Sequence, residues 1–133
     1  MTRQSITTKL RGDYGEAIAC RYLMARGFTI RTRNYMPARG VKRGEIDIVA
    51  EKDGAMHFVE VKTRFINGKS DTLTDPPEAQ ITVTKLRALS RAAQMYMRKE
   101  GLMHAVYHFD ALAITVFLPQ KRAQVRFLQD IFL

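Results

Sequence analysis

Two short segments rich in β-forming residues carry carboxylates whose spacing suits metal binding. They are residues 45–50 and 56–63, and the stretch between them contains Asp53-Gly54, a strong signal for a two-residue hairpin turn. This turn sets an antiparallel register in which Asp47 faces Glu60. The register therefore brings two carboxylates together, and such oxygens are the ligands that Mg²⁺ prefers.

The face of the hairpin that carries these acids is expected to hold a positive charge, because directly opposed carboxylates repel each other. Lys62, opposite Glu45 on this face, is one source of that charge, and a divalent cation is another. A solvated face is the third alternative, although Val49 and Phe58 on the same face indicate partial burial. With a bound metal, phosphodiester hydrolysis is the chemistry that these residue types suit. Lys62 would stabilise developing negative charge or, if burial lowers its pKa, help to deprotonate water.

Glu16 has two open interpretations. Residues 13–26 are predicted to form a helix, because Asp13 with Glu16 three positions later resembles a capping box and Gly27 can end the helix. Glu16 then either caps this helix and interacts favourably with its dipole, or it holds a water or a second metal ion at the catalytic site. It heads the face that continues through Ala19, Cys20 and Leu23.

Periodicity and turn residues predict the remaining elements. On the hairpin, Ile46 and Ile48 should share the apolar face. The order of elements is α, β, β, β, α, β, β, which predicts a mixed α/β or α+β fold. Besides the first helix and the hairpin, we expect a strand over residues 28–35, a helix over 83–100 and closing strands over 105–116 and 124–128.

The composition fits one folded domain of a basic, cytoplasmic protein. The 133 residues include 22 Lys and Arg and 13 Asp and Glu, giving a net charge of +9, and residues 1–43 hold ten basic side chains against two acidic ones. This one-sided charge predicts nucleic acid as a partner, with solubility alone as the alternative. The lone Cys20 excludes an intrachain disulfide and a zinc site built on several thiolates. No secretory signal or membrane span is predicted, so we expect no membrane partner.

Basic residues at two places are candidates for phosphate contacts. The loop over 36–44 lies just before the acidic strand, and the second helix carries arginines opposite its apolar side. A solvated helix face is the alternative explanation for these arginines. A cation near the start of that helix opposes the helix dipole, so a nearby phosphate would explain Lys85. The candidates for nucleic-acid binding are Arg39, Lys42, Arg43, Arg64, Lys85, Arg87 and Arg91.

The hairpin sequence resembles that of a nuclease superfamily. Residues 44–50 (GEIDIVA) and 58–64 (FVEVKTR) resemble the hairpin of PD-(D/E)XK nucleases in the form seen in archaeal Holliday junction resolvases. Over residues 13–133 the chain is similar to the YraN-like family of small bacterial proteins predicted to be endonucleases. This resemblance implies a single restriction endonuclease-like domain over 13–133, after a basic, flexible segment over 1–12. Such a domain is a three-layer α-β-α fold of the α/β class, in which helices flank a central mixed sheet.

The resemblance also implies roles for individual residues. Asp47 and Glu60 would bind Mg²⁺ or Mn²⁺, with the Val61 carbonyl as a third ligand, and Lys62 would lie beside the attacked phosphate. The implied activity is that of an endonuclease acting on DNA more than on RNA, with branched or damaged DNA as the substrate. The alternative is a non-catalytic nucleic-acid-binding module on the same scaffold. Whether the protein acts as a monomer or a homodimer stays open.

Two positions differ from the pattern of the superfamily. Ile46 stands where the superfamily's name has proline, a substitution common among its relatives. His108 precedes Phe109-Asp110 where we expect the family to have an arginine, which leaves the role of Asp110 open. The three histidines of the chain, which include His57 and His104, show no metal-ligand spacing and are predicted to be structural.

Overall fold

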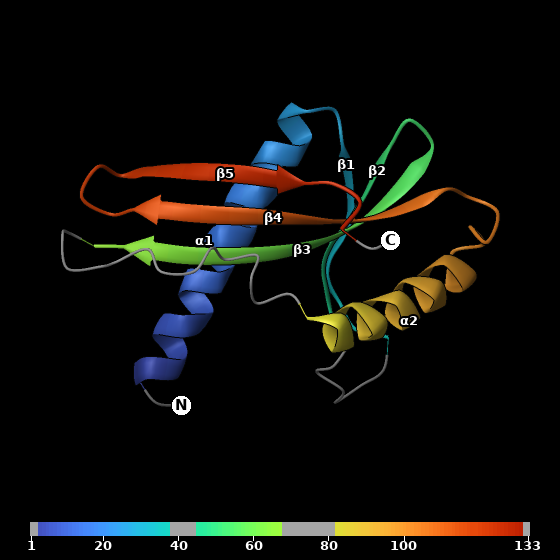
Figure 1. Ribbon diagram of the computed structural model, residues 1–133, viewed down its shortest axis with the longest axis horizontal. Coiled ribbons are helices and arrows are strands. Elements are labelled where there is room, and N and C mark those ends of the chain that lie inside the picture. The colour runs from blue at the N-terminus through green and yellow to red at the C-terminus, as the bar shows by residue number, and fades with distance from the viewer. Residues whose placement is uncertain (1–2, 38–44, 68–81, 132–133) are drawn as a thin grey trace.

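Seven elements make up the described parts of the protein (Figure 1). The computed structural model describes residues 3–37, 45–67 and 82–131, with side chains from residue 11 onward. The order of elements is αβββαββ, the order expected from the sequence. The elements are α1 (Arg3–Ala25), β1 (Thr29–Tyr35), β2 (Ile46–Lys52), β3 (Ala55–Ile66), α2 (Val83–Lys99), β4 (Tyr107–Phe117) and β5 (Arg122–Leu128).

The strands form one mixed sheet in the order β1-β2-β3-β4-β5. Neighbouring strands are antiparallel except β3 and β4, which are parallel because α2 carries the chain back across the sheet between them. In Figure 1, β3, β4 and β5 run together while β1 and β2 run across their direction. A mixed α/β fold is therefore confirmed.

The hairpin of β2 and β3 has the predicted register. Asp53 and Gly54 both have positive φ, 52° and 78°, as a type I′ turn requires. Val49 pairs with Phe58, and Ile48 pairs with Val59. Beyond this last pair β2 stays with β1, where Ile46 pairs with Tyr35, and leaves the β3 ladder. The expected pairs of Asp47 with Glu60 and of Glu45 with Lys62 therefore do not extend the ladder.

Because β2 separates from β3, the side chain of Ile46 lies on the opposite face of the sheet from the one expected. Ile46 was expected beside Ile48, but it packs with Val49 on the other face of the sheet. The strict alternation of side chains holds only while a strand follows a regular ladder. β2 leaves the regular ladder at Asp47, next to Ile48, whose pair with Val59 is the last one between β2 and β3.

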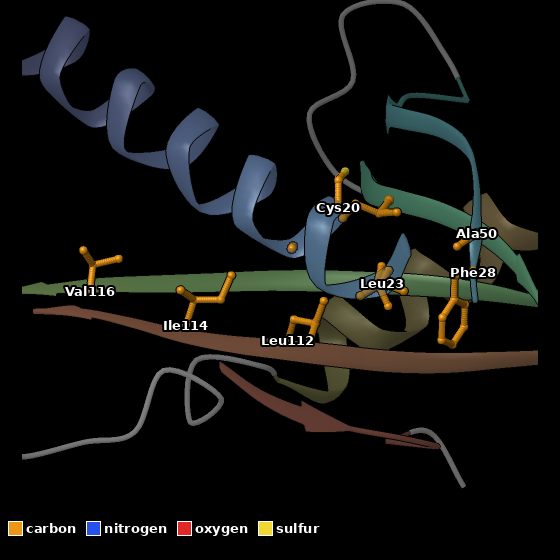
Figure 2. Close-up of a cluster of buried hydrophobic side chains, with 10 residues drawn as sticks. Cys20, Leu23, Phe28, Ala50, Leu112, Ile114 and Val116 are labelled. Carbon is orange, nitrogen blue, oxygen red and sulfur yellow. The ribbon is translucent and has the colours of Figure 1, made fainter. Parts of the chain in front are cut away.

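Each face of the sheet has its own core. Ile48 and Val59 pack on the face covered by α1, together with Ala19 and Leu23. Figure 2 shows that Leu112, Ile114 and Val116 of β4 point from the sheet toward the same helix. Val49 and Phe58, which alternate with Ile48 and Val59, lie on the opposite face and pack against α2. The face with the acidic residues is thus covered by a helix along part of its length.

The first helix begins earlier than predicted. α1 starts at Arg3, so Asp13 lies inside the helix and the capping-box interpretation of Asp13 and Glu16 is wrong. Residues 3–12, expected to be a flexible segment, are part of this helix. α2 matches its prediction closely, and Thr82 caps it by accepting a hydrogen bond from the Lys85 amide at 3.2 Å. Throughout the described residues, no helix is long and apolar enough to cross a membrane.

Candidate active site beside the β2–β3 hairpin

Asp47 occupies the point where β2 separates from β3. Its Oδ2 atom accepts a hydrogen bond from the Val61 amide at 2.8 Å, so the side chain replaces the missing backbone partner of that amide. Glu60 lies near enough for the charge of its carboxylate to raise the pKa of Asp47. The sequence prediction that Asp47 and Glu60 lie close together is confirmed, although the ladder itself ends before them.

Glu60 is the most buried acid of this cluster, with 4% of its surface exposed. Its Oε1 atom forms ion pairs with two ammonium groups, those of Lys62, at 3.4 Å, and Lys85. Its Oε2 atom is buried without a hydrogen-bond partner in the described structure. An unpaired buried carboxylate oxygen is costly unless a ligand or cation satisfies it, so Oε2 marks a place for a positive group.

Three groups of this cluster, Asp47, Lys62 and Lys85, have shifted pKa values. Burial first, and then repulsion from Glu60, raise the pKa of Asp47 to about 8, against the opposing effect of the Val61 amide. Burial and the neighbouring Lys85 ammonium lower the pKa of Lys62. Burial alone would also lower the pKa of Lys85, but its hydrogen bond and ion pair with Glu60 raise it. Lys85 is therefore the permanent cation of the cluster, whereas Lys62 loses its proton more easily.

The crossover helix brings Lys85 into the cluster. The Thr82 cap fixes the first turn of α2, and Leu89 and Ala92 anchor the helix on the sheet. The described structure pairs the Lys85 ammonium with Glu60, which accounts for a cation near the start of a helix. A contact between Lys85 and a phosphate stays a prediction.

The first helix places Glu16 at the same site. Gly15 lets α1 approach β3 closely, since a Cβ atom at this position would lie 1.9 Å from the Thr63 hydroxyl oxygen. Glu16 faces Arg33 of β1, with its Oε2 atom 3.4 Å from the guanidinium. Its negative charge contributes to the raised pKa of Asp47. Glu16 thus belongs to the electrostatic surroundings of the site, and its catalytic role stays a prediction.

A cavity of about 390 Å³ opens between α1 and the end of β3, next to these residues. Glu16 of α1 and Lys62 of β3 both line it, together with further basic residues. Arg11, which the sequence reasoning missed, is one of them, because the helix was expected to begin only at Asp13. The cavity is lined by Arg11, Gly12, Glu16, Val61, Lys62, Thr63, Arg64 and Phe65.

The donor set fits a cation that takes oxygen ligands and keeps several waters, as Mg²⁺ does. The Glu60 Oε2 atom is available, and Asp47 contributes a second carboxylate. The N–H and C=O of one strand residue point to the same side, so the Val61 carbonyl faces the opening beside Asp47. Among the described residues, no group of three or more His, Cys, Asp or Glu side chains is arranged to hold a metal.

The other candidates for nucleic-acid binding lie in three different environments. Arg64 lines the cavity and donates from Nε to the Thr115 hydroxyl at 3.0 Å. Arg87 and Arg91 are exposed on α2, which suits either phosphate contacts or a solvated face. Three further candidates, Arg39, Lys42 and Arg43, lie outside the described residues.

Asp110 is separate from this site. Its Oδ2 atom lies 2.6 Å from Nδ1 of the buried His57, and its Oδ1 atom accepts the Asp130 amide at 3.0 Å. The ring of His57 stacks on His108, which in turn contacts the Asp130 carboxylate at 2.6 Å. Asp110 and these two histidines thus hold the segment that follows β5 against β4, which is a structural role, as predicted for the histidines.

Comparison with known proteins places these features in a family. The sequence profile of the uncharacterised protein family UPF0102 matches residues 15–114. A UPF0102 protein of Dichelobacter nodosus is 34% identical over 131 residues, which is 98% of this chain and 95% of the relative. A UPF0102 protein of Clostridium perfringens is 31% identical over 91% of this chain and 92% of its own. One from Nitratiruptor is 41% identical over 79% of this chain and 82% of its own. The likeness to YraN-like proteins is confirmed at the level of the family.

Proposed function

The chain belongs to the uncharacterised protein family UPF0102, and for this member of it we propose a metal-dependent endonuclease that hydrolyses phosphodiester bonds in DNA. The proposed substrate is branched or damaged DNA, and the proposed location is the cytoplasm. The αβββαββ order, with helices on both sides of a mixed sheet, suits a restriction endonuclease-like core. That assignment is part of the proposal.

One observation carries the proposal. Glu60 is almost fully buried beside Asp47, yet its Oε2 atom has no hydrogen-bond partner within the described structure. A protein selected only for stability would pair this oxygen or replace the acid, because unsatisfied buried charge is destabilising. An adjacent cavity with Lys62 and Arg64 on its wall offers room for a phosphate. Carboxylates for a cation therefore lie next to basic groups for an anion.

The chain's own residues supply the parts that hydrolysis needs. A Mg²⁺ or Mn²⁺ ion held by Asp47, Glu60 and the Val61 carbonyl would stabilise charge on the phosphoryl oxygens and make water more acidic. Hydrolysis forms a bond from a water oxygen to phosphorus and breaks the bond to the leaving sugar oxygen, which takes up a proton. In its charged form Lys62 would stabilise negative charge on the phosphate, whereas its lowered pKa suits a group that accepts the proton of the attacking water. Lys85 keeps its charge and holds Glu60 in place.

A non-catalytic nucleic-acid-binding module is the second candidate. The observation that favours it is the double ion pair of Glu60, since Lys62 and Lys85 already neutralise part of the carboxylate charge. In this case the two lysines would stand in for the metal, and the basic surface alone would bind nucleic acid. The two candidates differ in whether divalent ions bind and whether phosphodiester bonds break.

A cleavage assay with matched variants tests the proposal. Linear, nicked, flapped and four-way DNA would be incubated with the protein in Mg²⁺, Mn²⁺ or EDTA. We expect cleavage only with a divalent ion, and loss of at least about a hundredfold in Asp47→Asn. Asp53→Asn is the control, because it makes the same chemical change at the exposed turn of the same hairpin, where asparagine is well tolerated.

Calorimetric titration with Mg²⁺ and Mn²⁺ separates the two candidates. The endonuclease proposal expects a divalent ion to bind the wild type and Asp53→Asn but not Asp47→Asn. Lys62→Ala should keep metal binding and lose turnover, because lysine acts on the transition state rather than on coordination. DNA binding without metal binding or cleavage would contradict the proposal and leave the binding module.

Salt dependence tests the proposed role of the basic loop. Affinity for DNA should fall steeply with salt, because each phosphate contact releases counterions. Neutralising Arg39, Lys42 and Arg43 together should flatten the slope of log K against log salt by about one for each lost contact. An unchanged slope would show that these three residues do not contact phosphates.

A further inference from the structure

Two aromatic rings lie together at the rim of the cavity. Tyr14 of α1 is 54% exposed, and its ring centroid lies 6.1 Å from that of Phe65 on β3 at an angle of 39°. Phe65 lines the cavity and also packs against the core that lies under α1. One ring is thus fixed by the core while its neighbour faces solvent.

A guanidinium completes the group. Arg11 precedes Tyr14 by three residues, so the two side chains emerge from the same side of α1. Its guanidinium carbon lies 4.9 Å from the centroid of the Phe65 ring, within the range of a cation–π contact. Arg11 and Phe65 both line the cavity, and the exposed ring of Tyr14 lies beside the Phe65 ring.

This group is close to the candidate catalytic residues. Phe65 follows Lys62 by three residues on β3, which at about 3.3 Å per residue is roughly 10 Å along the strand. Both residues line the same cavity, which they reach from opposite faces of β3, since side chains three positions apart in a strand point to opposite sides. A nucleic-acid strand whose phosphate lies at Lys62 can therefore bring a neighbouring base to the aromatic rim.

We propose that Arg11, Tyr14 and Phe65 form a stacking platform for an unpaired nucleobase adjacent to the phosphate held at Lys62. Exposed aromatic rings beside a basic groove are how proteins hold single-stranded nucleic acid, since every base has a face that stacks and phosphates follow the cations. Bases inside a duplex present their faces to each other and are not free to stack on protein. The platform rests on the proposed nucleic-acid function and narrows its substrate to one with an unpaired base at the site.

Binding of matched oligonucleotides in EDTA tests the platform without using cleavage. The probes are a short single strand carrying 2-aminopurine and its fully paired duplex, followed by fluorescence anisotropy and by quenching of the 2-aminopurine. Tyr14→Ala should weaken single-strand binding by about fivefold to a hundredfold and remove the quenching. Duplex binding should stay within about twofold of the wild type.

Two further variants separate the loss of stacking from other effects of changing an exposed side chain on α1. Tyr14→Phe should keep the single-strand affinity, because stacking needs the ring and not the hydroxyl. Met24→Ala truncates an apolar side chain that is also 54% exposed on the same helix, far from the cavity, and should change neither affinity. Thermal melts of both alanine variants would show that α1 still packs.

The possible outcomes separate the platform from the endonuclease. Equal effects of Tyr14→Ala on single strand and duplex, or no effect on either, would overturn the platform while leaving metal-dependent cleavage intact. Single-strand binding that depends on Tyr14, in a protein that cuts no DNA, would support the platform and favour the binding module. A wild-type protein that binds neither probe would overturn the platform, and the assays with flapped and four-way DNA would still decide between the two proposed functions.

Discussion

Replacing Asp47 with asparagine should remove most of the decline in stability that the metal-free protein shows as pH rises. Burial and repulsion from Glu60 raise the pKa of Asp47 to about 8, whereas an ordinary aspartate has a value of 3.8. The folded state therefore keeps the proton of Asp47 at pH values where the unfolded chain has released it. Asparagine is neutral at every pH, and its side-chain oxygen can still accept the Val61 amide.

The expected magnitude follows from linkage between protonation and folding. Between the ordinary and the raised pKa, the folded state binds one more proton than the unfolded state, so stability falls as pH rises. Each pH unit in this window is worth about 1.4 kcal/mol, so three units from pH 5 to pH 8 amount to about 4 kcal/mol. The stability contributed by the retained proton of Asp47 is fully present below the ordinary pKa and is lost as pH rises through about 8.

Urea denaturation of the wild type and Asp47→Asn in EDTA, at each pH from 5 to 8, measures the effect. Groups distant from Asp47 titrate alike in both proteins and cancel in the comparison, so the difference between the two stability curves reports Asp47 together with the acids that interact with it. We expect the wild type to lose about 2–4 kcal/mol more than the variant across this range. Mg²⁺ should restore the wild type near pH 8 and leave Asp47→Asn unchanged. Parallel curves for the two proteins would refute the raised pKa and the electrostatic account of the site.

Two further predictions concern the packing that surrounds the site. Gly15→Ala should lower stability by about 1–2 kcal/mol in thermal melts, because its Cβ would strike Thr63, whereas Gly12→Ala on the same helix meets nothing and should stabilise by up to about 1 kcal/mol. Equal melting temperatures for the two variants would contradict the close approach of α1 and β3. Asp110→Ala should lose about 3 kcal/mol in urea denaturation by leaving His57 and the Asp130 amide without their acceptor, and Asp110→Asn should lose less.

Local sequence signals predicted the hairpin well. The Asp53-Gly54 turn determined the register, and the register brought Asp47 near Glu60. The position of Ile46 was wrong, because no local signal shows that β2 leaves β3 and stays with β1. The start of α1 was also misjudged, since a capping-box pattern at Asp13 also occurs inside longer helices.

Contacts between distant segments could not be read from the sequence. Lys85 reaches Glu60 only because α2 crosses the sheet, and periodicity gives a helix its apolar face but not its position on the sheet. The partner of Asp110 is His57, which lies 53 residues away. Nothing in the sequence distinguishes Gly15 from other helical glycines, because the residue that it approaches, Thr63, lies on a distant strand.

The parallel pairing of β3 with β4 has a consequence for the order of folding. The β2–β3 hairpin closes through a two-residue turn and can form early, whereas β4 and α2 reach the hairpin only after a long crossover connection. Asp47 and Glu60 lie at the open end of this hairpin, and Lys85 can neutralise Glu60 only after α2 has docked. Until the crossover docks, the acids oppose closure of their end of the hairpin, so we expect this end to be the last part of β2 and β3 to become ordered.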